Sequence, residues 1–379
     1  MPRTMERQAD LAGPGIGSYE ELEKHLPTDY TPLLDPKETQ RAIHDLRAFV
    51  EDGLCRELNL RPVTVPLLVD AESGLNDFLD KDGARQPIEF RIDNDHGKNP
   101  ITAQVVQAAT KWKRYALNQF GFEVGEGLIT DMRAVRKDYF LDHDHSSYVD
   151  QWDWEQVISD RDRNLDYLTD AVERIWKVLT GAESFILERY PVLQTPKYPR
   201  LPETLTFIHS EDLLAHYPRL SRQERETEIV KECGAVFVYG IGWTLANGFP
   251  HEMRAPDADD WVTETRSKDG RIMHGLNGHI IAWNPVTQRR HELSSMGIRV
   301  DRETLQRQLE LTDRIDLLHY PYHQAVVRDL LPLSIGGGIG QSRTFMLLLR
   351  KAHLGEVSVS VWPKALKDMC AERRIHVLE

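Results

Sequence analysis

The chain has 379 residues, 47 of them basic and 60 acidic, which gives a formal net charge of −13. This balance argues against a protein that binds nucleic-acid phosphates, because such proteins present basic surfaces. No apolar run approaches the ~20 residues that span a membrane, and the charged N-terminus lacks the apolar core of a signal peptide. The three cysteines, Cys55, Cys233 and Cys370, are far apart. They favour a reducing cytoplasm over a disulfide framework or a zinc site.

The first half of the chain predicts two long helices and one short β-rich piece. Residues 1–34 carry glycine, proline and scattered charge without a clear period, so we predict a poorly ordered arm or lid there and a single domain over 35–379. Asp35 and Pro36 are a good N-cap and first helical residue, and apolar residues recur on one face up to Leu58. A β-rich piece follows over 62–69, and a second helix is predicted over 165–190.

The second half is rich in strands. Residues 204–208, 235–239, 279–283 and 292–300 have the composition of strands, whereas helices are predicted over 302–312 and 321–330. Strands and helices do not alternate regularly, as they would in a doubly wound parallel sheet. The predicted fold class is therefore α+β, with an antiparallel sheet flanked by helices.

A glycine-rich run at 336–340 precedes a helix that carries Arg343 near its start. The glycine spacing does not match the dinucleotide fingerprint, and no lysine follows as in a P-loop. The run is either a tight turn that packs a helix or a place where a nucleotide approaches the backbone. Arg343, in an otherwise apolar helix, favours phosphate or adenine binding.

Three further segments combine charged and polar residues. Glu292, Ser295 and Arg299 share one strand and could hold Mg²⁺ and phosphate oxygens, but taken alone the segment favours a half-buried edge strand with a solvated Glu292. The acidic and histidine-rich loop at 142–145 is interpreted as a solvated turn rather than a metal site. Arg136, just before this loop, is the better candidate for a phosphate ligand.

The segment 148–155 predicts a strand on which Gln151 and Asp153 point to one side, because alternate residues share a face. Such a polar pair suits an amino-acid substrate, although a strand end with surface acids is the simpler alternative. The basic tetrapeptide at 111–114 is either a helix face or the place of one functional lysine. The acid-rich segment at 254–261 could bind a metal or an ammonium group, or it could be a solvated loop.

Taken together, these motifs resemble the ammonia-dependent asparagine synthetases, the aspartate–ammonia ligases of the AsnA type. The resemblance runs from about residue 36 to 365, and its motifs are KWKR (111–114), GEGLITDMRAVR (125–136), SYVDQWDWE (147–155), GAVFVYGIG (234–242), RAPDADDW (254–261), GLNG (275–278), WNP (283–285), ELSSMGIRVD (292–301), GGGIGQSR (336–343) and VWP (361–363). That family is similar to the catalytic domain of class II aminoacyl-tRNA synthetases. The resemblance implies this fold and a homodimer formed through the first long helix and the strand after it.

The implied chemistry has two half-reactions, in which ATP adenylates the side-chain carboxylate of aspartate and ammonia then displaces AMP to give asparagine. The resemblance implies that Asp77 guides or deprotonates the incoming ammonium and that Arg136 and Arg343 are catalytic through ATP. The other implied roles divide between ATP (Ser295, Arg299), the amino acid (Lys113, Gln151, Asp153, Asp259) and Mg²⁺ (Glu292).

Several positions depart from the family pattern. Gln107-Ala108 replaces a His-Ser pair, Trp243 replaces a glycine, and His279 replaces an aspartate expected to bind Mg²⁺ with Glu292. Ala108 and Trp243 are therefore expected to reshape the substrate surroundings, and His279 the metal site. These departures leave two alternatives open. One is a paralogue that joins the adenylate to another amine or activates another amino acid, and the other is a non-catalytic relative that binds amino acids or nucleotides. A tRNA synthetase is not expected, because the net charge is unsuited to tRNA.

Overall fold

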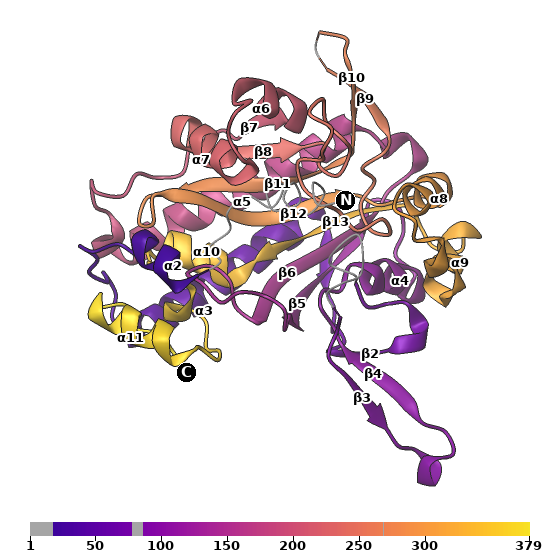
Figure 1. The fold of residues 1–379 in the computed structure, drawn as a ribbon, viewed down its shortest axis with the longest axis horizontal. Coiled ribbons are helices and arrows are strands. Elements are labelled where there is room, and N and C mark those ends of the chain that lie inside the picture. The colour runs from indigo at the N-terminus through magenta and orange to yellow at the C-terminus, as the bar shows by residue number, and fades with distance from the viewer. Residues whose placement is uncertain (1–17, 78–85, 268) are drawn as a thin grey trace, which may run out of the picture.

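A computed structural model describes residues 18–77, 86–267 and 269–379 (Figure 1). Its centre is an eight-stranded sheet in which the inner strands are antiparallel and the two outermost pairs are parallel. In spatial order the strands are β1 (Leu60–Pro62), β5 (Gly127–Val135), β6 (Tyr148–Val157), β13 (Ser334–Gly340), β12 (Arg289–Ile298), β11 (Asn277–Asn284), β8 (Ala235–Tyr239) and β7 (Thr206–His209). The predicted α+β class with a largely antiparallel sheet is confirmed.

Two long helices cover one face of the sheet. Helix α3 (Pro36–Leu58) begins with a capping box between Asp35 and Glu38, and α5 (Leu165–Arg189) lies beside it. Trp152 and Trp154 of β6 point into the core that these helices close, and both side chains are fully buried. Because each helix buries one face against the sheet, its apolar residues recur with helical spacing in the sequence.

The opposite face carries shorter elements and the polar side chains described below. Helix α4 (Thr110–Phe120) packs on β6 and α7 (Arg222–Cys233) packs on β8, β11 and β12. The remaining helices are α2 (Tyr19–His25), α6 (Ser210–His216), α8 (Arg302–Leu311), α9 (Pro321–Val327), α10 (Gln341–Leu348) and α11 (Lys364–Glu372). A ribbon of β2 (Leu68–Asp70), β4 (Ile101–Val105) and β3 (Glu89–Ile92) projects from the body, as does the hairpin of β9 (Glu264–Arg266) and β10 (Ile272–His274) (Figure 1).

Residues 18–34 differ from the predicted poorly ordered arm. They form α2 and a following segment whose apolar side chains, Leu22, Leu26, Tyr30 and Leu34, are buried in the main core. The Tyr30 hydroxyl also donates a hydrogen bond to the carboxylate of Glu356. Apolar side chains spaced along a polar segment become ordered when they are buried against a core formed by the rest of the chain. Local composition does not reveal that core. Residues 1–17 of the predicted arm lie outside the described residues.

Two local predictions need correction. The β-rich piece over 62–69 is two short strands, because β1 ends at Pro62 and β2 begins at Leu68. Proline has no N–H for the ladder, and this segment holds two of them. The glycine run is not a turn but part of β13 inside the sheet, and the helix α10 begins only at Gln341.

Candidate active site

A single row of residues crosses the open face of the sheet. The strand register pairs Asp153 of β6 with Gly338 of β13, Gly338 with Ser295 of β12, and Ser295 with His279 of β11. Directly paired residues point to the same face of a sheet, so these side chains share one surface. A Cβ on Gly338 would lie 2.5 Å from Oε1 of Gln151. Glycine is therefore required where the surface must stay open beside Gln151 and Asp153.

Gln151 and Asp153 point to the same side of β6, as their alternation predicted, since both approach Gly338. Asp153 is only 2 % exposed, and burial raises the pKa of its carboxyl. Its Oδ1 accepts a hydrogen bond of 2.5 Å from Lys113 of α4. Among the described residues, its buried Oδ2 has no hydrogen-bond partner. Asp153 thus keeps one buried carboxylate oxygen that no described group satisfies.

The ammonium of Lys113 is held by groups of the chain itself. Its ammonium donates to Asp153 and to the carbonyl oxygens of Trp154 and Gly337, at 2.5, 2.9 and 3.1 Å. An ammonium has three N–H donors, so these acceptors use all of them. The side chain is fully buried. Lys113 therefore orients Asp153 and joins α4 to the sheet rather than offering a free cation to a substrate carboxylate.

A chain of charged groups continues from β6 along the same face. The guanidinium of Arg299 makes a two-pronged contact with Glu155, at 2.9 and 2.8 Å, and also donates to Oδ1 of Asp259. Arg254 donates to Oδ2 of Asp259 at 2.6 Å and to the hydroxyl of Ser295 at 3.1 Å. Arg299 was expected at ATP, but its contacts with two buried carboxylates instead make it an organiser of Asp259.

Asp77 lies near the start of α4 and is only 6 % exposed. One oxygen accepts the backbone N–H of Thr110 at 2.7 Å. Burial raises the pKa of Asp77 to about 6, although the Lys111 ammonium opposes this shift. A carboxyl that titrates near neutral pH suits a group that takes up a proton. Ala108, which is also buried, precedes the helix on the same turn.

Arg136 and Arg343 both contact the loop between β5 and β6, Arg136 at Tyr139 and Arg343 at Asp144. Arg136 donates to the carbonyl oxygen of Gln107 at 3.0 Å and lies 5.7 Å from the centre of the Tyr139 ring. Arg343 donates to the carbonyl oxygens of Asp144, at 3.2 Å, and Glu292, at 3.3 Å. The hydrogen bonds of both guanidiniums thus go to neutral carbonyl groups, and Arg343 also lies 3.8 Å from the carboxylate of Glu292.

The group around Glu292 does not fit Mg²⁺ as predicted. Both ring nitrogens of His279 face carboxylates, with Nε2 at 2.6 Å from Glu252 and Nδ1 at 3.4 Å from Glu292. Burial opposes it, but these two carboxylates raise the pKa of His279 to about 9. An imidazolium has no lone pair for a metal. Arg290, at 3.0 Å, and Arg343, at 3.8 Å, add further cations around Glu292, so this arrangement of side chains already neutralises Glu292.

The loop at 142–145 is not the solvated turn that we predicted. Asp142, His143 and Asp144 are 5 %, 5 % and 6 % exposed. The ring of His145 lies between the two carboxylates, with Nδ1 3.0 Å from Asp142 Oδ1 and 2.8 Å from Asp144 Oδ1. Although burial opposes it, this pairing raises the pKa of His145 to about 10. Charged groups this close in sequence can be buried because they neutralise one another.

Trp243, which was expected to reshape the substrate surroundings, contacts the β9–β10 hairpin and α8. Its ring stacks on His274 of β10, with centroids 4.1 Å apart, and the guanidinium of Arg307 lies 5.5 Å from its centre. The tryptophan therefore fastens the β9–β10 hairpin to α8. Sequence reasoning assigned no role to Arg254, Glu155 or Glu252. Their only signal was membership of charged segments that a solvated surface explained as well.

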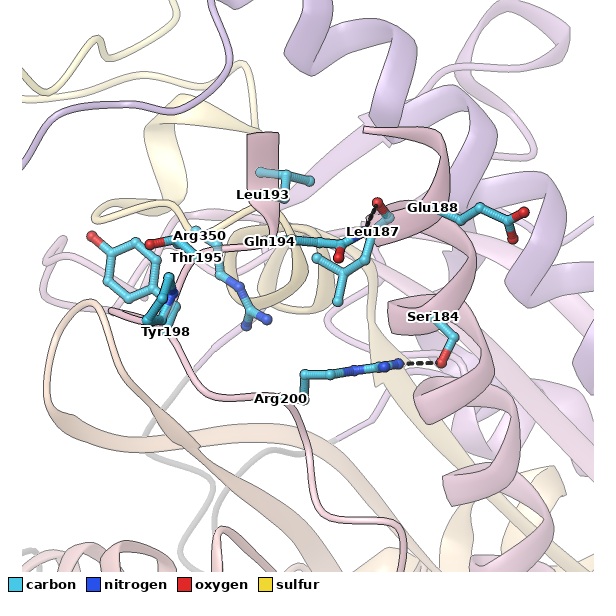
Figure 2. Close-up of a pocket in the computed structure, with 10 residues that line it drawn as sticks. Ser184, Leu187, Glu188, Leu193, Gln194, Thr195, Tyr198, Arg200 and Arg350 are labelled. Carbon is cyan, nitrogen blue, oxygen red and sulfur yellow. Dashed lines mark hydrogen bonds between the residues drawn. The ribbon is translucent and has the colours of Figure 1, made fainter. Parts of the chain in front are cut away.

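A cavity of about 640 Å³ lies on α5 and the segment that follows it, on other elements than the row described above (Figure 2). Arg200 and Arg350 line it; Arg200 donates to Ser184, and Arg350 is paired with Glu183 at 2.7 Å. The predicted site residues do not line this cavity. No described helix is both long and apolar enough to cross a bilayer.

Comparison with known proteins places the chain in one family. The profile described as AsnA, aspartate–ammonia ligase, matches residues 37–374. An aspartate–ammonia ligase of Clostridium perfringens SM101 is 45 % identical over 353 residues, which are 93 % of this chain and 98 % of that protein. One of Bacteroides thetaiotaomicron is 45 % identical over 352 residues, with the same coverage of both chains.

Solved structures support the fold independently. Asparaginyl-tRNA synthetase of Pyrococcus horikoshii, solved with asparaginyl-adenylate, superposes with a TM-score of 0.59 at 15 % identity and covers 86 % of this chain and 70 % of its own. The Entamoeba histolytica enzyme gives 0.59 at 10 % identity, with 85 % and 67 % coverage. The sheet and its helices thus have the class II aminoacyl-tRNA synthetase fold, and the chain belongs to the aspartate–ammonia ligase family.

Proposed function

We propose that this protein is an AMP-forming ligase that converts aspartate, ammonia and ATP to asparagine, AMP and pyrophosphate. Membership of the aspartate–ammonia ligase family supports this reaction. The observation that carries it in the structure is the buried Asp153 with an unused Oδ2, beside Gln151 and over Gly338. A buried carboxylate oxygen without a donor is costly. The α-ammonium of an amino acid would satisfy it.

In the first half-reaction, a side-chain carboxylate oxygen of aspartate attacks the α-phosphorus of ATP and the bond to pyrophosphate breaks. Negative charge grows on the phosphoryl oxygens during this step. Arg136 and Arg343 donate their hydrogen bonds to carbonyl oxygens, and Arg343 can exchange its longer contact with Glu292, at 3.8 Å, for these phosphoryl oxygens. Ser295 faces the same surface from the next strand and can donate its hydroxyl to a substrate oxygen.

Binding of aspartate also involves Asp259 and Arg254. Arg254 is the more exposed of the two guanidiniums on Asp259, with 22 % of its side chain accessible against 5 % for Arg299. Arg254 can therefore turn toward a substrate carboxylate while Arg299 keeps Asp259 in place. Gln151 then accepts or donates one further hydrogen bond to the amino-acid head group.

In the second half-reaction, ammonia attacks the acyl carbon of the aspartyl-adenylate and the bond from that carbon to the AMP oxygen breaks. Ammonium must first lose one proton, and the amide nitrogen loses a second after attack. Asp77, with a pKa of about 6, is ionised at neutral pH and can both attract ammonium and take its proton.

Mg²⁺ normally accompanies ATP and would add positive charge at its phosphates. The residues around Glu292 do not fit it, because His279 and three arginines already neutralise Glu292 and Glu252: Arg222, Arg290 and Arg343. The steps above therefore use only groups of this chain.

We further propose a homodimer that forms through α3 and the edge strand β1, without nucleic acid or membrane as partners. The parallel pairing of β1 with β5 leaves its other edge open for a second copy. The net charge of −13 is unfavourable for tRNA. A cytoplasmic location is consistent with the free thiols of Cys55, Cys233 and Cys370.

The experiment is a product analysis by mass spectrometry with ATP, Mg²⁺ and aspartate, in parallel with ammonia and with a panel of small amines. Asparagine and AMP formed best with ammonia would support the proposal. A better product from another amine or acid would favour the repurposed paralogue, because Ala108 lacks a hydroxyl near Asp77. Failure to form AMP or pyrophosphate would favour the non-catalytic relative.

A further inference from the structure

A group of buried histidine and aspartate side chains lies beside Arg343 and has no part in the ligase mechanism. Ligand atoms of Asp142, His143 and Asp144 lie within 4.8 Å of one another. A third element adds His291 of β12, whose Nδ1 lies 4.0 Å from Oδ2 of Asp144. His143 and His291 are 5 % and 1 % exposed. Bulk solvent therefore does not supply hydrogen bonds to their ring nitrogens.

The hydrogen bond of His291 decides its tautomer. Its Nε2 lies 2.9 Å from the carbonyl oxygen of Arg343. A carbonyl oxygen can only accept, so Nε2 carries the proton and Nδ1 of the neutral ring keeps a lone pair. This lone pair faces Asp144 Oδ2, which is also an acceptor. Two acceptors that face each other at 4.0 Å leave room for a cation between them, and histidines that bind metals typically donate their second nitrogen to a carbonyl in this way.

His143 completes the arrangement. Its Nε2 lies 4.0 Å from the same oxygen of Asp144 and its Nδ1 3.8 Å from Oδ1 of Asp142, both beyond hydrogen-bond range. Within the described part of the chain, its buried Nδ1 has no hydrogen-bond partner. Zinc ligands lie about 2.0–2.2 Å from the ion, so in a tetrahedral site two of them are about 3.3–3.6 Å apart. The two contacts of 4.0 Å to Asp144 Oδ2 are slightly longer, so a bound ion would draw the two rings about 0.5 Å closer to this oxygen.

The remaining groups contact other atoms than this oxygen. His145 contacts Oδ1 of Asp144 at 2.8 Å, on the other side of the carboxylate from Oδ2. Oδ1 of Asp142 accepts hydrogen bonds from the backbone N–H groups of Asp144 and His145. Asp142 therefore adds negative charge to the site but does not serve as a ligand of the ion. The guanidinium of Arg343 donates to the carbonyl oxygen of Asp144, and the charges of Arg343 and Arg289 also act on the Asp144 carboxylate.

We propose that Asp144, His143 and His291 bind one divalent first-row transition-metal ion, such as Zn²⁺ or Co²⁺, through one carboxylate oxygen and two imidazole nitrogens. Mixed nitrogen and oxygen ligands select such ions over Mg²⁺, which requires oxygen ligands. The ion joins the β5–β6 loop to β12, and both of its anchor points contact Arg343. The loop is already fixed on another side, since the Leu354 N–H donates to the His143 carbonyl oxygen at 2.7 Å.

The test uses the full-length chain after chelation, without ATP or aspartate, so its result does not depend on ligase activity. Co²⁺ is titrated while its visible absorption is recorded, and Zn²⁺ is then added as a competitor. We expect one Co²⁺ per chain in a low-symmetry site with nitrogen ligands, displaced by Zn²⁺ but not by Mg²⁺. Zn²⁺ should also raise the melting temperature of the wild-type chain at one equivalent.

The variants His291→Phe, His143→Gln and Asp144→Asn should each weaken Co²⁺ binding by at least ~10-fold. The matched control is His216→Ala, which removes an exposed histidine of α6 and should leave binding unchanged. Circular dichroism identifies any variant that fails to fold, and the other two then decide. The proposal is overturned if the wild type binds no Co²⁺, if Mg²⁺ competes equally, or if the folded variants bind like the wild type.

Discussion

The ammonium of Lys113 lies 2.5 Å from the carboxylate of Asp153, and both side chains are almost completely buried. Lys113 therefore orients Asp153, whose second carboxylate oxygen can bind the substrate. Because the lysine also donates to two carbonyl oxygens of neighbouring strands, the position of Asp153 depends on the packing of α4 against β6 and β13.

Replacing Lys113 by Met should destabilise the protein strongly. The change leaves the carboxylate of Asp153 buried without its cation, and breaking such a pair costs about 3–5 kcal/mol. The measurement is urea unfolding at neutral pH. In the double variant Lys113→Met/Asp153→Asn the buried charge is gone, so most of this loss should be recovered. Equal destabilisation by the single and double variants would show that the pair is not coupled.

Replacing Arg343 by Ala should raise the KM for ATP and lower the rate of pyrophosphate release. A charge-assisted hydrogen bond contributes about 1.5–3 kcal/mol, which corresponds to roughly a 10- to 100-fold loss in kcat/KM. Arg307→Ala is the control, because Arg307 contacts the ring of Trp243 instead. Pyrophosphate release is followed with ATP and aspartate in the absence of ammonia. Unchanged kinetics in the Arg343 variant would contradict its assignment to ATP.

Replacing Asp77 by Asn should reduce asparagine formation and yet stabilise the folded chain at neutral pH. Burial raises the pKa of Asp77 from 3.8 to about 6, so the folded protein favours the protonated form. The resulting cost of ionisation is absent below pH 4, grows as the pH rises to 6, and reaches at most about 3 kcal/mol above it. Urea unfolding at pH 5 and pH 7.5 should show the variant's advantage increasing with pH. A constant difference would contradict the raised pKa.

The wild-type rate of amide formation should rise with pH through about 6 if Asp77 acts as the base. Pyrophosphate release in the absence of ammonia should not follow that profile, because adenylation does not require this proton transfer. A shared pH profile for both half-reactions would place the titrating group elsewhere.

Replacing His279 by Asp should strengthen the response of the protein to Mg²⁺. The change removes the imidazolium between Glu252 and Glu292 and adds a third carboxylate, and carboxylate oxygens are the ligands that Mg²⁺ prefers. Melting temperature as a function of Mg²⁺ concentration is the readout. His279→Gln is the matched control, since it removes the charge without adding a ligand. Identical Mg²⁺ dependence in all three proteins would show that the ion does not bind here.

The sequence alone determined the elements that depend on local periodicity and on capping. The apolar face that ends at Leu58, the cap at Asp35 and the alternation of Gln151 and Asp153 on β6 all follow from neighbours within a few residues. The joint set of motifs also determined the family and the fold class.

Only the tertiary structure decided which charged groups meet. Lys113 and Asp153 are 40 residues apart, and Arg299 and Glu155 are 144 apart, so no local pattern shows that they pair. The same holds for His291 and Asp144, which β12 and the β5–β6 loop bring together. A charged side chain is solvated or buried according to the partners that folding places beside it, because burial is affordable only when the opposite charge is present.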